Sequence, residues 1–227
     1  MGGVLSSSNR LVLGLALLLG SGCQRALPVR LASEYHAAAI EKGALRERTD
    51  YSDPVLVDLR TILLTTEINE SSSREIISKL LFLDSLSHQP IHLYLSTYGG
   101  FIKDAFSIID VVETLESPVN TIGMGACYSG GALLLAAGTG TRSVMPNTTI
   151  VLHSPTPEGK TNPQLGALWL KINHDYLSRR TRLPAGKLPT QPDRRLVLSL
   201  PDALEFGLID TIINPQNLPS NNPHADL

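Results

Sequence analysis

The chain has 227 residues, of which 42% are hydrophobic, and its formal net charge is −2. This size and composition fit one globular domain with terminal extensions. The charge is near neutral without a basic cluster, and aromatic residues make up only 5%, so the sequence gives no indication of nucleic-acid binding. It also lacks a cysteine–histidine cluster with zinc spacing and a Walker-type glycine loop, which predicts no metal and no cofactor.

The first 23 residues resemble a targeting segment. A weakly positive start precedes the apolar run LVLGLALLLG (11–20), which is short for a membrane span. Cys23 follows small residues, as at a bacterial lipoprotein site, but Gly20 stands where such sites usually have leucine. A cleaved signal peptide, a lipid anchor at Cys23, an uncleaved membrane anchor and a misassigned start codon all stay open. We expect 24–54 to be a linker or terminal arm.

From residue 55 onward, strand-like and helix-like segments alternate. Apolar spacing predicts strands at 55–64, 91–96, 119–125, 141–145 and 149–153, and helices at 71–86 (with serines available as its N-cap), 103–116 and 129–137. Such alternation implies βαβ units and a largely parallel sheet, whose ligands gather at the carboxyl ends of strands. The remaining segments are expected to be a projecting helix at 165–183, a loop at 184–195, a short helix and strand within 199–213, and a disordered tail at 215–227.

Three of the predicted strand ends carry residues suited to attack on a carbonyl. Ser129 follows a strand and a turn of small residues and opens the helix SGGALLLAAG, so its hydroxyl lies beside free helix N–H groups. Gly100 ends the strand segment IHLYLSTYGGF, and its N–H and that of Gly130 can stabilise an oxyanion. His153 ends a further strand, where a general base can face the serine. Each feature alone is more often a packing device, but the three together favour a catalytic site.

Cys127 is a rival nucleophile. It lies just before Ser129 but lacks the position that opens the helix. We therefore expect Cys127 to pack as a small apolar side chain.

Together these motifs resemble the ClpP family, the proteolytic subunit of the Clp protease. The resemblance covers 55–214 and rests on STYGG (96–100) for the family's glycine loop, MGACYSGG (124–131) for its serine elbow, VLHSP (151–155) for its base and ALEFGLID (203–210) for its closing motif. Tyr98 stands where the family has proline. The resemblance implies an α/β fold of the ClpP/crotonase type, built from repeated βαβ (β-β-α) units, here with a shortened projecting handle helix.

The resemblance also implies roles and partners. Ser129 would be the nucleophile, His153 the general base, and Gly100 and Gly130 the oxyanion-hole donors. The substrate would be an unfolded polypeptide inside a ring of like or unlike subunits, fed by an AAA+ unfoldase, without a cofactor. The family is cytoplasmic or organellar, whereas the N-terminal segment points to export or membrane anchoring, so both locations stay open.

The third catalytic residue of the family is missing from its place. The family has an aspartate four positions before the residue that opens the last helix, and here Arg195 stands four positions before Ser199. Loss of the acid from a serine triad typically costs about ten-thousandfold in rate, and a positive charge opposes the imidazolium. Asp193 is the expected replacement, with Asp202 the second choice, although a two-residue shift moves a carboxylate by about 6–7 Å along an extended chain.

Three functions therefore stay open. The first is an active serine endopeptidase of Clp type that uses Asp193. The second is a non-catalytic ClpP-like (ClpR-type) ring subunit, which Arg195 favours. The third is an envelope-side protease similar to signal-peptide peptidases, which use a serine–lysine pair.

Overall fold

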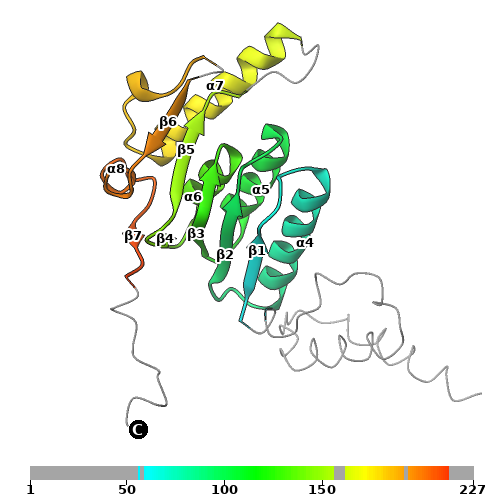
Figure 1. Ribbon diagram of the computed structural model, residues 1–227. Coiled ribbons are helices and arrows are strands. Elements are labelled where there is room, and N and C mark those ends of the chain that lie inside the picture. The colour runs from blue at the N-terminus through cyan, green and yellow to red at the C-terminus, as the bar shows by residue number, and fades with distance from the viewer. Residues whose placement is uncertain (1–55, 57–58, 156–161, 192–193, 215–227) are drawn as a thin grey trace, which may run out of the picture.

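The computed structural model in Figure 1 describes residues 56, 59–155, 162–191 and 194–214. Within these ranges the elements are β1 (Thr61–Leu64), α4 (Glu70–Leu86), β2 (Ile91–Thr97), α5 (Ile102–Thr114), β3 (Val119–Tyr128), α6 (Gly130–Ala137), β4 (Arg142–Val144), β5 (Thr149–His153), α7 (Pro163–Arg180), the 3₁₀ turn η2 (Ala185–Lys187), β6 (Arg195–Leu198), α8 (Leu200–Glu205) and β7 (Thr211–Ile212). The predicted segments 1–23, 24–54 and 215–227, and the proposed acid Asp193, lie outside the described residues. None of the helices described is both long and apolar enough to cross a membrane.

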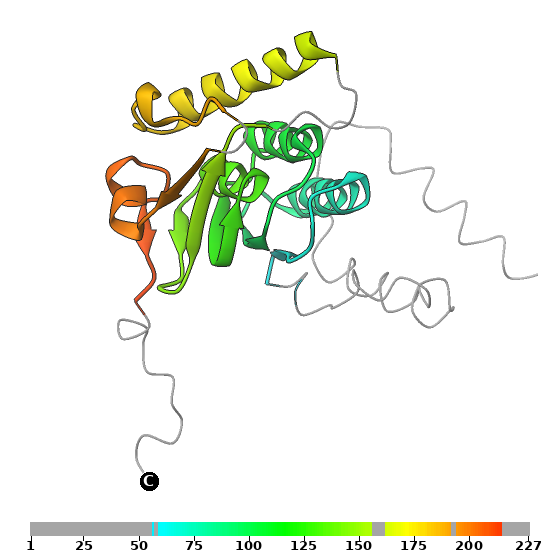
Figure 2. The same cartoon turned by 45° about the horizontal axis from the view of Figure 1, so that its top comes forward.

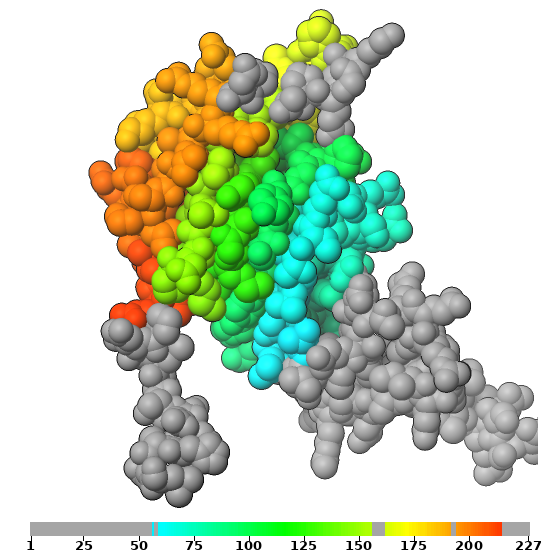
Figure 3. All heavy atoms as spheres, in the orientation of Figure 1, coloured from blue at the N-terminus to red at the C-terminus, as the bar shows by residue number. Residues whose placement is uncertain are grey.

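The described strands form one sheet that is parallel except at one edge. The order is β1-β2-β3-β4-β7, and β5 pairs in parallel with the carboxyl end of β3. Because β1 to β4 follow one another across the sheet through right-handed crossovers, α4, α5 and α6 pack on the same face (Figures 1 and 2). Figure 3 views the opposite face, where β1, β2 and β3 lie at the surface. The predicted α/β fold with a largely parallel sheet is confirmed.

Four details differ from the sequence prediction. The strand predicted at 55–64 begins only at Thr61, after a turn at 59–60. The strand β3, predicted to end at residue 125, continues to Tyr128. A bulge makes this possible: the pairing of β3 with β2 shifts in register after Leu95↔Gly123 and resumes at Thr97↔Cys127. The predicted loop at 184–195 ends in a strand, since β6 begins at Arg195 and pairs antiparallel with β5. The serine cap predicted for α4 is also wrong.

The N-cap of α4 is an asparagine rather than a serine. The side chain of Asn69 accepts the N–H groups of Ser71 and Ser72, while Ser72 Oγ accepts the Asn69 N–H at 2.9 Å. This reciprocal pairing satisfies N–H groups that a helix start leaves free, so one of the serines serves as the second half of a capping box.

The handle helix α7 packs on the core through its C-terminal half. Tyr176 and Leu177 are buried there, and the ring of Phe106 contacts Tyr176 edge-on and stacks on Trp169. Towards the N-terminus, Leu165 and Leu168 are 44% and 51% exposed. That half of α7 extends past the sheet, as Figure 2 shows.

An arginine of β4 holds the segment 203–210, the closing motif of the sequence, against the sheet. The side chain of Arg142 donates to both carboxylate oxygens of Asp210 and to the carbonyl oxygen of Gly207 at 2.7 Å. The backbone N–H of Arg142 donates to the same carboxylate. These hydrogen bonds hold the pKa of Asp210 below its ordinary value.

The Arg142–Asp210 pair predicts acid-sensitive stability. Because the folded-state pKa of Asp210 is lowered, the pair stabilises the fold above the ordinary aspartate pKa of about 3.9 and loses this effect as the pH falls through the depressed value. We expect Asp210→Asn to lower the midpoint of thermal unfolding at neutral pH, and the difference from the wild type to vanish in acid. Glu70→Gln, which removes an exposed pair with Arg74, is the control and should change little. Equal melting of the wild type and Asp210→Asn at pH 7 would contradict the assignment.

Candidate active site

Ser129 occupies a strained turn between β3 and α6. It is the N-cap of α6 with φ 53° and ψ −122°, a conformation that costs a non-glycine residue about 1–3 kcal/mol. Its N–H donates to the carbonyl of Val151 on β5 at 2.8 Å. All eight residues of α6 are buried, and burial of Leu134 and Leu135 contributes about 1.5–3 kcal/mol each, enough to offset the strain. The turn therefore lies at Ser129 itself, not in the preceding small residues as predicted.

The glycine loop after β2 has a backbone that only glycine fits. Gly99 and Gly100 have φ values of 92° and 154°. A Cβ on Gly100 would lie 2.0 Å from the carbonyl oxygen of Ile68. The backbone of Ile68 in turn bonds both sides of this loop, donating to Gly99 O and accepting the N–H of Phe101. The loop is thereby fixed against the chain between β1 and α4.

Gly100 belongs to the glycine loop and Gly130 is the first residue of α6, and these two segments touch. A Cβ on Gly99 would be 2.7 Å from Ser129 Cβ and 3.0 Å from Gly130 N, so the glycine loop packs directly on the elbow. Neither the Gly100 N–H nor the Gly130 N–H donates to any described residue. The structure therefore brings the two predicted oxyanion donors to the serine with their hydrogens unused.

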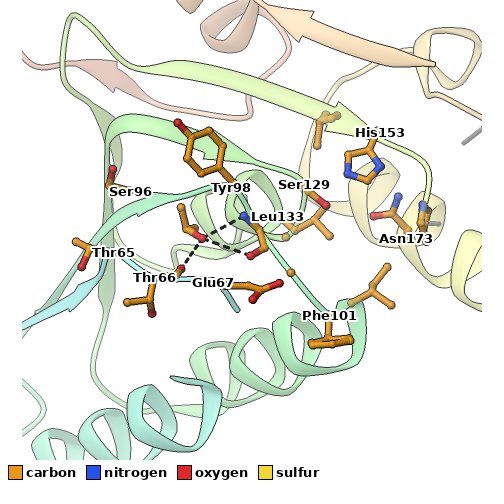
Figure 4. Close-up of a pocket in the computed structure, with 17 residues that line it drawn as sticks. Thr65, Thr66, Glu67, Ser96, Tyr98, Phe101, Ser129, Leu133, His153 and Asn173 are labelled. Atoms are coloured by element: carbon orange, nitrogen blue, oxygen red, sulfur yellow. Dashed lines mark hydrogen bonds between the residues drawn. The ribbon is translucent and has the colours of Figure 1, made fainter. Parts of the chain in front are cut away.

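His153 ends β5 beside the elbow. The pairing Tyr128↔Val151 aligns the ends of β3 and β5, which places His153 just beyond the level of Ser129. Both side chains line one cavity of about 650 Å³, shown in Figure 4. No hydrogen bond joins Ser129 Oγ to the imidazole, as is common in a serine site without substrate.

The cavity also contains a residue that the sequence analysis missed. Its lining is Thr65, Thr66, Glu67, Ser96, Thr97, Tyr98, Gly99, Gly100, Phe101, Ile102, Ser129, Gly130, Leu133, Leu152, His153, Pro155 and Asn173. Asn173 of α7 is 4% exposed, and its Oδ1 has no hydrogen-bond partner among the described residues. The signal in the sequence is an amide on the apolar stripe of a helix, between Trp169 and Tyr176.

The predicted acids do not contact His153 in the described part of the chain. Arg195 is the direct cross-strand partner of His153 in the β5–β6 ladder, and its side chain is exposed. Asp202 accepts a hydrogen bond from Ser199 Oγ at 2.6 Å and is not a lining residue. Asp193 lies outside the described residues, so its role stays a prediction.

Cys127 is unsuited to be the nucleophile. Its side chain is fully buried, and its thiol lies 3.5 Å from the carbonyl oxygen of Leu95. Burial raises the pKa of this thiol to about 12, so the reactive thiolate is scarce at neutral pH.

A serine on a strained strand-to-helix turn, with a neighbouring histidine and two free amides, is typical of serine hydrolases.

A family model described as Clp protease matches residues 44–216. Two curated relatives align over 174 residues and 72% of the chain: proteolytic subunit 1 of the ATP-dependent Clp protease of Salinibacter ruber (32% identical, 74% of that protein) and proteolytic subunit 3 of Nocardia farcinica (30%, 79%). A mutant of ClpP1 from Listeria monocytogenes has a similar solved structure, with TM-score 0.64 and 25% identity over 71% of this chain and 96% of that one. The chain belongs to the Clp protease family.

The contact between the glycine loop and the elbow predicts a sensitive position. In Gly99→Ala the new Cβ overlaps Ser129 Cβ, which displaces the serine from the two amides. We expect this variant to react with a fluorophosphonate about 100-fold more slowly or worse, the usual cost of losing an oxyanion donor. Gly186→Ala is the matched control, because nothing lies within 4 Å of its Cβ. Equal reaction rates for the two variants would show that the loop does not touch the reacting centre.

Proposed function

We propose that this chain is a serine endopeptidase subunit of Clp type that cleaves unfolded polypeptides inside a ring chamber. One observation carries the proposal: Ser129, His153, Gly100 and Gly130 all line a single cavity, and the amides of the two glycines donate to no described residue. The four residues come from three separate places, namely the glycine loop after β2, the elbow between β3 and α6 that holds both Ser129 and Gly130, and the end of β5. Family membership supports the same roles.

The geometry supports acyl transfer from a peptide bond. Ser129 Oγ attacks the scissile carbonyl carbon while His153 Nε2 takes its proton. The N–H groups of Gly100 and Gly130 stabilise the resulting oxyanion. The imidazolium then gives its proton to the leaving amine, the C–N bond breaks, and water hydrolyses the acyl-enzyme by the same steps.

The proposed partners follow from the family rather than from contacts of this chain. Subunits of one or more kinds would form the ring, and an AAA+ unfoldase would deliver the polypeptide. The exposed side chains of Leu165 and Leu168 on the extended half of α7 give an apolar surface that suits contact with another subunit.

A non-catalytic ring subunit is the second candidate, and one observation favours it. Arg195 stands opposite His153, where the family has an aspartate, and its positive charge opposes the imidazolium that catalysis requires. The unused amides and the strained Ser129 argue against this candidate, because a silent subunit needs neither.

An envelope-side peptidase with a serine–lysine pair has less support. None of the described residues that line the cavity is a lysine. The base available to Ser129 in the described part of the chain is His153.

Covalent labelling separates the first two candidates. We expect the wild-type protein to bind a fluorophosphonate covalently and Ser129→Ala to lose the label, because the probe reacts only with an activated serine. Ser96→Ala is the matched control, since Ser96 lines the same cavity and should be dispensable. Absence of labelling in the folded wild-type protein would support the non-catalytic subunit.

Restoring the acid tests the role of position 195. We expect Arg195→Asp to raise kcat/KM for a peptide by about tenfold or more, because a carboxylate there stabilises the imidazolium. Arg195→Gln is the control that removes the positive charge without adding a negative one. If Arg195→Asp has no more effect than Arg195→Gln, Asp193 or another group already supports His153.

A further inference from the structure

The imidazole of His153 is held by a main-chain carbonyl. Its Nδ1 lies 2.6 Å from the carbonyl oxygen of Ser154. A carbonyl oxygen only accepts hydrogen bonds, so Nδ1 carries the proton, and in the neutral ring Nε2 keeps its lone pair. This is the tautomer that a general base needs, and in a serine triad it is fixed by the aspartate.

The direction of this carbonyl is itself fixed. The Ser154 side chain is 2% exposed, and its hydroxyl donates to the carbonyl oxygen of Pro189 at 2.5 Å. The Pro189 oxygen also accepts the Nε2–H of His174 on α7 at 3.2 Å. Pro155 follows, and a residue before proline is confined to extended backbone. The Ser154–Pro155 peptide, which carries this carbonyl, is therefore held both by the side chain of Ser154 and by the ring of Pro155.

No described carboxylate competes for this task. Among the described residues, no acidic side chain accepts a hydrogen bond from His153, and Arg195 occupies the cross-strand position. The Ser154 carbonyl is thus the acceptor that the structure provides for Nδ1.

We propose that Ser154 is a positioning residue that replaces the missing acid: its carbonyl fixes the tautomer of His153 and its hydroxyl holds that carbonyl in place. This rests on the proposed peptidase function. When Ser129 Oγ bonds to the substrate carbon, its proton passes to Nε2, and the Nδ1–H of the imidazolium stays bonded to the carbonyl. A neutral oxygen stabilises the imidazolium less than a carboxylate does, so the enzyme works more slowly than one with the acid.

A double-variant experiment tests this role by the rate of fluorophosphonate labelling of the full chain. We expect Ser154→Ala to slow labelling by roughly 10–100-fold, because small displacements of a catalytic group have effects of this size. Arg195→Asp should then raise the labelling rate of Ser154→Ala by well more than the gain of about tenfold expected in the wild-type background, since cross-strand partners place a carboxylate beside the imidazole. In the wild-type background the same substitution should give a clearly smaller gain.

Thr148→Val is the control for folding. It removes another buried hydroxyl that donates to a main-chain carbonyl, that of Gly123, outside the cavity. Its labelling rate should stay near that of the wild type, and circular dichroism should show all variants folded.

Two results would overturn the proposal for Ser154. One is an unchanged labelling rate in Ser154→Ala. The other is an equal gain from Arg195→Asp in both backgrounds, which would make the effect of Ser154 merely structural. Failure of the wild-type protein to label at all would instead overturn the peptidase function, so the two failures are distinct.

Discussion

The site depends on the forced backbone conformation of Ser129. A non-glycine residue with φ 53° is stable only where its surroundings leave no alternative. Here the preceding strand is fixed in the sheet, the following helix is entirely buried, and the Ser129 N–H is bonded to β5. Relaxing the turn would pull α6 out of the core, which costs more than the strain. The hydrophobic core therefore sets the direction of the hydroxyl.

The same buried helix connects the parts of the cavity. Packed beneath the sheet, α6 contacts β3 and β5 on one side and α5 and α7 on the others. The glycine loop touches its first residue, and Tyr176 of α7 donates to the carbonyl oxygen of Leu133 at 3.1 Å. Because all of these elements pack against α6, a side chain on any of them has a fixed position relative to Ser129.

Local patterns predicted the elements and the chemistry that each carries. Apolar spacing and the glycines were sufficient for the helices and for most strands, and Ser129 and His153 were found because each stands at the end of its own strand. Relations between elements were not predictable in the same way. The strand β6, which begins at Arg195, has only four residues and pairs with β5, a strand far away in the sequence. The burial of Asn173 depends on how α7 packs against the core. The Ser154 carbonyl carries no signal at all, because every residue has one.

The contact between the glycine loop and the elbow makes the sizes of two side chains interdependent. Position 99 already has the smallest residue that exists, so it cannot yield space to a bulkier neighbour at position 129. A serine is close to the least volume that can carry a hydroxyl. Evolutionary change at this nucleophile is thereby confined to residues of similar bulk, whatever chemistry the remainder of the cavity acquires.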